Sequence, residues 1–152
     1  MTTLELPSPK LEEWRWADLP AIRAAAESDH APAGVDPKSL FLDIPGPRLL
    51  FVDGAFEPAH SVPGRVQVGP IVSETAHPLG GLAQGEGWAL TLGREQVEEH
   101  VQVVHLGSGG ESHVPARIVM AEDAVASVVE TYAGAGWANR LTRIELARGA
   151  GC

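Results

Sequence analysis

Hydrophobic and polar residues alternate along the second half of the chain. In four stretches, β-branched and apolar residues take every second position and polar residues take the others. Alternation of this kind places the apolar side chains on one face of a β-strand and the polar ones on the other. The four stretches are 101–106, 113–120, 125–132 and 141–146. The pattern predicts a β-rich region and is compatible with a sandwich, a barrel or a β-solenoid.

The first half of the chain has a mixed pattern. Apolar residues recur at roughly helical spacing up to residue 26, with an interruption near Pro20, which predicts one short helix over 9–16 and another over 19–26. Trp14 and Trp16 would lie on different faces of the first helix, so one can pack against the core while the other covers a surface or a partner interface.

The segment between the helices and the β-rich region contains turn signals. Residues 27–47 are rich in proline and predict an extended loop, whereas 48–56 (RLLFVDGAF) predicts a hairpin that turns at Asp53-Gly54. Residues 66–72 predict a further strand. The glycines of 80–87 lack the lysine and hydroxyl residues of a phosphate-binding loop, so this stretch is predicted to be a flexible loop.

Composition narrows the classes of function. The chain has 152 residues, enough for one domain, with 17 glycines, 12 prolines and a net charge of −9. A negative charge of this size disfavours nucleic acid and anionic membranes as partners. Cys152 is the single cysteine, and no signal peptide or apolar span is recognisable, so a reducing, cytoplasmic location is expected.

Histidines are the strongest candidates for chemistry. His100, His105 and His113 lie close together in the β-rich region, and with Glu130 they offer the ligand types of a small metal-binding β-barrel of the cupin kind. The spacing argues against such a site, because residues five apart face opposite sides of a regular strand. No serine or cysteine has a recognisable catalytic partner. We therefore predict no enzyme activity and no catalytic, cofactor-binding or metal-binding residue, with the metal site as the alternative.

Three blocks of sequence resemble one family. Residues 12–19 (EEWRWADL) resemble the N-terminal signature of SufD-type members of the SufB/SufD family, scaffold subunits of the SUF iron-sulfur cluster assembly machinery, although Trp16 replaces a tyrosine. Residues 48–58 (RLLFVDGAFEP) resemble the hairpin of that family. Residues 100–150 resemble the start of its β-helix, including Val-Val-Glu-Thr-Tyr and Trp-Ala-Asn.

The resemblance implies a fold and a function. Residues 1–95 would form a mixed α+β N-terminal region, and 96–152 would form the first turns of a right-handed β-helix. The chain would be a non-catalytic scaffold in iron-sulfur cluster assembly, acting with SufB- and SufC-type partners and binding no cofactor itself. Only the first part of the family's length is matched. A β-helix that stops after the strand at 141–146 has an open end, so self-association is expected.

Overall fold

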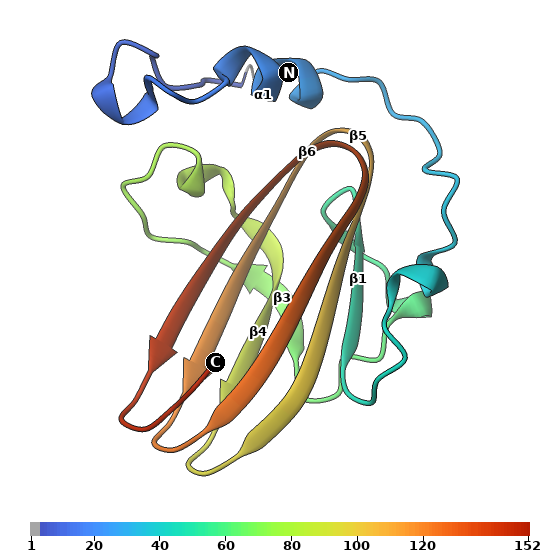
Figure 1. Ribbon diagram of the computed structural model, residues 1–152, viewed down its shortest axis with the longest axis vertical. Coiled ribbons are helices and arrows are strands. Elements are labelled where there is room, and N and C mark those ends of the chain that lie inside the picture. The colour runs from blue at the N-terminus through green and yellow to red at the C-terminus, as the bar shows by residue number, and fades with distance from the viewer. Residues whose placement is uncertain (1–3) are drawn as a thin grey trace.

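The computed structural model describes residues 4–152, which form one six-stranded mixed sheet below a short helix (Figure 1). The strand order is β2-β1-β5-β4-β3, and β6 pairs with β5. The strands are β1 Arg48–Val52, β2 Ala55–Phe56, β3 Gln67–Ile71, β4 Gly85–Leu92, β5 Val97–Met120 and β6 Val125–Leu146, and the α-helix is α1 Leu19–Ala26. Four 3₁₀ turns lie at Glu12–Trp14, Pro37–Leu40, Pro58–His60 and Gly80–Leu82.

The two long strands β5 and β6 each run upward, curl over at a glycine-rich bend and return (Figure 1). We call the parts before and after the bend the first and second arms. The two strands stay parallel and in register along both arms, at an offset of 27 residues where His105 faces Tyr132 and of 26 where Ile118 faces Ile144. The four predicted strand stretches are these four arms, and their β-structure is confirmed.

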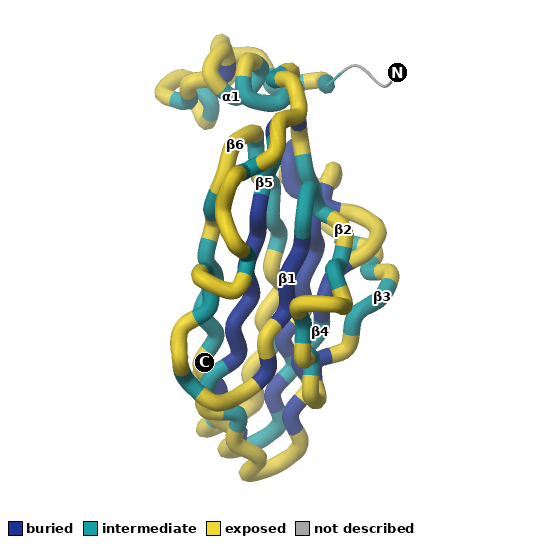
Figure 2. Tube along the Cα trace, turned by 90° about the vertical axis from the view of Figure 1, so that its right-hand side faces the viewer, coloured by how far each residue is buried: buried dark blue, intermediate teal, exposed yellow. Residues whose placement is uncertain are grey.

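The core lies between the two arms. The first arm of β5 pairs with β1 and the second arm pairs with β4, both in parallel, so the sheet encloses its own apolar side chains. Figure 2 shows β5 buried along most of its length, whereas β6 is mostly half-buried or exposed. The buried core cluster comprises Leu49, Phe51, Val66, Trp88, Leu90, Leu92, Val101, Val103, Val114, Ala116, Ile118, Met120, Ala124 and Ala126.

The turns that follow β4, β5 and β6 each contain a residue with a positive φ. Glu95, Asp123 and Gly149 occupy equivalent places and all have a positive φ, of 60°, 58° and 73°. The turns also stack, since the Glu95 amide donates to the carbonyl of Glu122 and the Asp123 amide donates to the carbonyl of Arg148. A residue with left-handed backbone dihedrals lets the chain reverse direction within a short turn. The chain therefore reverses in a similar way at three successive turns.

The α1 helix is confirmed over the predicted residues. Asp18 caps it by accepting a hydrogen bond from the amide of Ala21 at 3.0 Å, and Pro20 fits in the first turn, where no intrahelical amide bond is lost. The helix predicted over 9–16 is wrong in extent, because only Glu12–Trp14 form a 3₁₀ turn. No residue of that turn is buried, so packing does not stabilise a longer helix.

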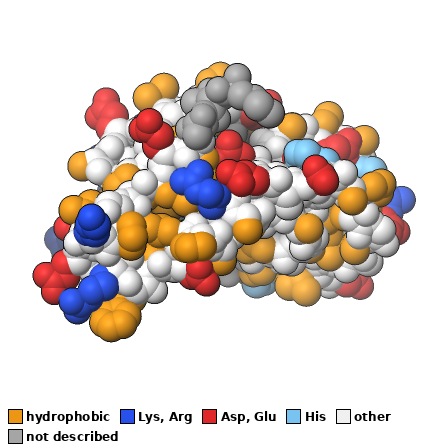
Figure 3. Space-filling view, turned by 90° about the horizontal axis from the view of Figure 1, so that it is seen from above, with side chains coloured by type: hydrophobic (Ala, Val, Ile, Leu, Met, Phe, Trp, Pro, Cys, Tyr) orange, Lys and Arg blue, Asp and Glu red, His pale blue; other side chains and the backbone are white. Residues whose placement is uncertain are grey.

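The helix and the bend form the upper face of the molecule. Acidic, basic and hydrophobic side chains are interspersed on this face (Figure 3). Trp16 is 86% exposed, whereas Trp14 packs edge-on against His77 with ring centroids 5.3 Å apart. One tryptophan therefore packs and the other covers a surface, as the spacing predicts. In the part of the chain from residue 4 onward, no helix is long and apolar enough to cross a membrane.

The prediction for the hairpin is confirmed, whereas the prediction for the glycine-rich segment is wrong in part. The hairpin over 48–56 is confirmed, with β1 and β2 flanking the turn at Asp53-Gly54, and the strand predicted over 66–72 appears as β3. The loop predicted over 80–87 is wrong in part, because β4 begins at Gly85. A Cβ atom at Gly87 would lie 2.0 Å from the carbonyl oxygen of Pro115, so this glycine permits close strand packing.

Candidate functional site

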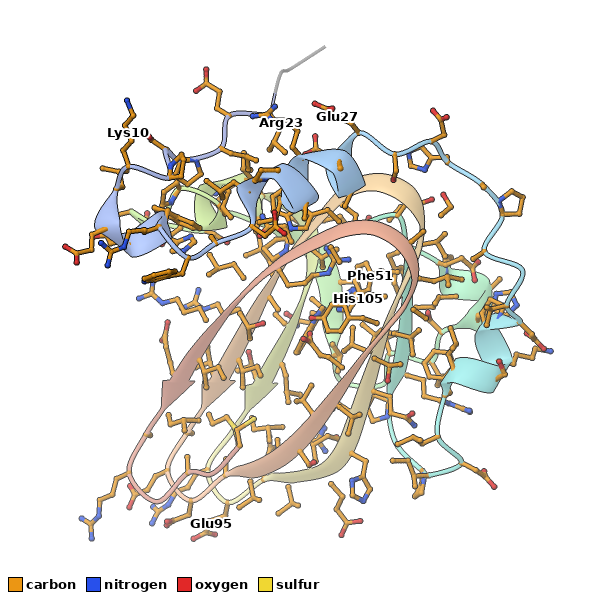
Figure 4. All side chains as sticks on the ribbon, turned by 45° about the horizontal axis from the view of Figure 1, so that its top comes forward. Lys10, Arg23, Glu27, Phe51, Glu95 and His105 are labelled. Carbon is orange, nitrogen blue, oxygen red and sulfur yellow. The ribbon has the colours of Figure 1, made fainter. Side chains whose placement is uncertain are left out.

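A ladder of three rings lies inside the bend. Phe51, His105 and Tyr132 are direct register neighbours on β1, β5 and β6, so their side chains stack across the sheet. The His105 ring centroid lies 5.7 Å from that of Phe51 and 4.9 Å from that of Tyr132, and Figure 4 shows His105 and Phe51 next to each other beneath the bend. His105 is 2% exposed, whereas Tyr132 on the last strand is 51% exposed.

Arg140 reaches the ladder from the second arm of β6. Its Nε donates to Nδ1 of His105 at 3.0 Å, and its two Nη groups donate to the backbone oxygens of Ser112 and Asn139 and to the Ser112 hydroxyl. The guanidinium therefore ties the two arms together below the bend. Because Nδ1 of His105 accepts a hydrogen bond, the hydrogen of the neutral imidazole is on Nε2.

Glu130 lies on the other side of His105. Its Oε2 accepts a hydrogen bond from the Tyr132 hydroxyl at 2.8 Å, and its Oε1 is 3.5 Å from Nε2 of His105. That separation is longer than an ordinary hydrogen bond. The buried Nε2 atom thus has no hydrogen-bond partner among residues 4–152. An unpartnered buried donor is uncommon and calls for an explanation.

Burial and neighbouring side chains shift the pKa values of these groups. It lowers the pKa of the His105 imidazole, as does the neighbouring Arg140 cation, while Glu130 opposes the shift. Burial alone would raise the pKa of Glu130, but contacts with His105 and Tyr132 outweigh it and lower the pKa. The pKa of Tyr132 is raised and that of Arg140 is lowered, in both cases mainly by burial. His105 is therefore neutral and Glu130 ionised at neutral pH.

A cavity of about 150 Å³ opens at the bend. Its walls are the side chains of His105, Ser112, Tyr132 and Arg140, together with the backbone of the two bends. Glycine is required here: a Cβ atom at Gly134, whose φ is +91°, would lie 2.0 Å from the carbonyl oxygen of Gly107. The site combines a cation, a neutral imidazole and close backbone in one small space.

The four residues singled out for metal binding do not converge. His105 and Glu130 lie close together inside the coil. His113 faces the other side of the second arm, where it contacts Asn139 at 3.0 Å and Glu111 at 3.3 Å. His100 lies at the far end of the first arm, with its carbonyl against Gly46. Among the described residues no group of three or more histidine, cysteine or carboxylate side chains could hold a metal ion.

A second polar cluster lies on the outer side of the bend. The Ser108 hydroxyl donates to Oδ2 of Asp53 at 2.7 Å and lies 2.8 Å from Nδ1 of His30. In a catalytic triad the histidine stands between the serine and the carboxylate, whereas here the serine is central. Ser108 also accepts from the Ala31 amide through its carbonyl, so this cluster fastens the segment after α1 to the bend.

A larger groove of about 1000 Å³ follows the outer face of the second arms. Arg117 and Arg143 are register neighbours in it, and each lies 3.1 Å from the same carboxylate oxygen of Glu145. Ser73 and Glu74 form part of the opposite wall. The charges in this groove compensate one another, so it is a weaker candidate for a binding site than the bend.

Comparisons with known proteins give no family assignment. No protein-family model matches the chain, and no curated protein matches it. The resemblance to the SufB/SufD family therefore stays a prediction.

Sequence reasoning found His105 and Glu130 but missed Tyr132 and Arg140. The signal that could have found Tyr132 is the recurrence of a similar strand and glycine bend 27 residues after His105. The sequence gives no such signal for Arg140, because its register neighbour on β5 is Val114. Only the curling of the sheet brings the arginine to the histidine.

The buried imidazole predicts a pH dependence of stability. The pKa of His105 in the folded chain lies below its ordinary value of 6.5. As pH falls below 6.5, the unfolded chain therefore binds more protons at this position than the folded chain does. The free energy of unfolding should therefore fall between pH 6.5 and pH 5. The carboxylates with lowered pKa values act at lower pH, since their ordinary values are 3.8 and 4.5.

Urea unfolding of the wild type and of His105→Phe at pH 5 and pH 6.5 measures this difference. Phenylalanine keeps the ring stack and cannot take up a proton. The free energy of unfolding of this variant should therefore depend less on pH between pH 5 and pH 6.5 than that of the wild type. His100→Asn is the matched control, since His100 lies outside the ladder and should leave the pH dependence unchanged. An equal pH dependence in His105→Phe and the wild type would contradict the assignment.

Proposed function

We propose that the chain forms the first coils of a right-handed β-helix and serves as a non-catalytic scaffold in iron-sulfur cluster assembly. The curled sheet supports the coil, because β5 and β6 remain parallel and in register on both arms. The repeated turn at Glu95, Asp123 and Gly149 supports it independently. Solenoids bury their core by stacking equivalent coils in this way.

The exposed inner side of β6 is the observation that carries the scaffold proposal. Inner-facing side chains of β5 are mostly buried, whereas on β6 Tyr132 and Ile144 are each 51% exposed and Leu146 is 48% exposed. Among the described residues, β6 has a paired strand only on the β5 side, apart from an isolated bridge between Val125 and Gly151. An apolar face beside an unpaired edge is suited to strand pairing with another protein segment.

The resemblance to the SufB/SufD family supplies the identity of the partners. SufB- and SufC-type proteins are the partners that the matched blocks at 12–19, 48–58 and 100–150 imply. The absence of a convergent nucleophile and base among the described residues also favours contacts with proteins over catalysis. A second copy of the chain can occupy the same surface, so self-association competes with partner binding in this proposal.

The alternative function is a small metal-binding β-barrel of the cupin kind. His105 and Glu130 are close enough to contribute two ligands. The Arg140 guanidinium disfavours this reading, because it occupies Nδ1 of His105 and places a positive charge beside the pair. Stoichiometric iron, zinc or manganese that disappears in a His105→Ala, His113→Ala double variant would favour the metal protein over the scaffold.

Co-expression tests the scaffold proposal. The tagged chain is expressed together with SufB- and SufC-type proteins, and the amount of each that is retained after affinity purification is measured. We expect the wild type to retain a partner and Ile144→Asp to retain at least about tenfold less, because a carboxylate on the apolar inner face of β6 would be desolvated in the complex.

Val72→Asp is the matched control for this experiment. Val72 is 81% exposed and lies outside β6, so the same change of side chain should leave retention unaffected. Failure of the wild type to retain either partner would overturn the scaffold function. Equal retention by Ile144→Asp and the wild type would show that the inner face of β6 is not the contact surface.

A further inference from the structure

The ladder of rings under the bend ends at an exposed face. Phe51, His105 and Tyr132 occupy the same register position on three neighbouring strands, and each ring stacks on the next at interplanar angles of 27° and 20°. Among residues 4–152, Tyr132 has a stacked ring on one side only, because β6 is the last strand, and it is 51% exposed. A further ring can stack on it in the same way, since cross-strand aromatic pairs stabilise a sheet.

The cavity at the bend has room for that ring. Tyr132 lines it together with Trp137 and the glycine-rich backbone of the β6 bend. Its volume is about 150 Å³. An apolar cavity of about this volume holds one benzene molecule. A six-membered aromatic ring therefore fits this space, whereas a nucleotide does not.

The charged side chains at the cavity are already engaged. Arg140 donates four of its five N–H groups to neutral acceptors, and the charge of Glu130 also stabilises the guanidinium. Glu130 in turn accepts the hydrogen bond from the Tyr132 hydroxyl. Neither charge requires a charged ligand, so an uncharged ring is the chemistry that suits the open side of Tyr132.

The edge of β6 determines what kind of molecule would carry the ring. Among the described residues, β6 pairs with β5 alone, apart from the bridge between Val125 and Gly151, so most of its outer edge can accept a further strand. A parallel strand in the register that β6 keeps on β5 would bring a side chain directly over Tyr132. A second copy that continued the curl with the same face inward would run antiparallel under two-fold symmetry. Pairing centred on the first arm, 125–132, would then place Val125 rather than a ring opposite Tyr132.

We propose that the cavity under the bend receives one uncharged aromatic side chain, which stacks on Tyr132 and is carried by a β-segment of a partner protein that pairs with the edge of β6. The inference rests on the proposed function, since it names the feature of the partner that the exposed face of β6 selects. Phenylalanine and tyrosine side chains have the required ring. The bond from the Tyr132 hydroxyl to Glu130 holds the stacking surface in place before the partner arrives.

Titration of the full chain with the peptide SVVQTYAG tests the proposal. The peptide repeats residues 127–134, with glutamine in place of the glutamate to avoid a second carboxylate over Glu130, so it can pair with β6 as β6 pairs with β5. Tyr132 is the single tyrosine of the chain, so isotope labelling of tyrosine gives one ring spectrum. We expect saturable one-to-one binding and an upfield shift of the Tyr132 ring resonances. The peptide SVVQTAAG, which lacks the ring, should bind at least about tenfold more weakly.

Tyr132→Val removes the stacking surface and keeps a strand-forming residue, so it should bind the aromatic peptide at least about fivefold more weakly by calorimetry. Trp16→Val is the matched control, because it also exchanges an exposed aromatic side chain for valine but lies outside β6. Its affinity for the peptide should equal that of the wild type. Should Tyr132→Val fail to fold by circular dichroism, the ring shift in the wild type and the difference between the two peptides decide the question.

Equal binding of the two peptides, or no shift of the Tyr132 ring resonances at millimolar peptide, would overturn the proposal. Binding of p-cresol, a free analogue of the tyrosine side chain, as tightly as the aromatic peptide would overturn it in favour of a small aromatic molecule. A shift of the Tyr132 resonances with protein concentration alone would overturn it in favour of a second copy. None of these measurements uses a SufB- or SufC-type protein, so this proposal and the scaffold function can fail separately.

Discussion

Replacement of Gly134 by alanine is expected to lower the free energy of unfolding by about 2–5 kcal/mol. Gly134 lies at the bend of β6 with a φ of +91°, where a residue with a side chain is strained. The added Cβ would also lie 2.0 Å from the carbonyl oxygen of Gly107, which is backbone and cannot rotate away. Both effects act on the point where β5 and β6 curl together, so the coil should open there first.

Chemical denaturation followed by circular dichroism measures this loss. Gly81→Ala is the matched control, because a Cβ at Gly81 has no atom within 4 Å and its φ is not positive. That variant should change the free energy of unfolding by less than about 1 kcal/mol. Equal stability of Gly134→Ala and Gly81→Ala would contradict the close packing of the two bends.

Replacement of Trp88 by alanine is expected to cost about 3–5 kcal/mol of unfolding free energy. Trp88 is 1% exposed and is the largest fully buried side chain in the described chain. It lies on β4, opposite Ala116 of β5 and Val68 of β3, so its removal leaves a cavity where the three strands meet. The surrounding backbone is held in sheet hydrogen bonds and can close only part of that cavity.

Trp16→Ala makes the same substitution at the surface and is the control. Trp16 is 86% exposed and stacks with the Arg15 guanidinium, so the change should cost less than about 1 kcal/mol. Trp88→Phe separates packing from polarity, since it keeps a ring and removes the Nε1 group that has no partner within the described residues. Its cost should be well below that of Trp88→Ala. Similar losses in Trp16→Ala and Trp88→Ala would contradict the location of the core.

Local features of the fold were predictable because a few neighbouring residues determine them. The Asp18 cap and Pro20 define the start of α1, and Asp53-Gly54 provides the positive φ values that the hairpin turn needs. The missing helix at 9–16 shows the limit of this reasoning: helical spacing of Leu11 and Trp14 predicts a helix only where the apolar side is buried.

The candidate site was only partly predictable, for a geometric reason. Residue type points to His105 and Glu130, but the alternative metal site also includes His113, which faces the other side of its arm. The side chains that contact His105 include Tyr132, 27 residues away, and Arg140, 35 residues away. Their proximity depends on strand register and on the bend, which local spacing does not contain.

By itself, the sequence determined the α1 helix, the hairpin at 48–56, the strand at 66–72 and the four arms of β5 and β6, because these follow from alternation, turn residues and caps at short range, whereas it did not predict β4. The tertiary structure alone decided that the strands stack in parallel as two bent layers, that Arg140 meets a buried imidazole and that the inner side of β6 stays exposed. The same alternating pattern satisfies several sheet architectures, and only contacts between distant residues select one of them.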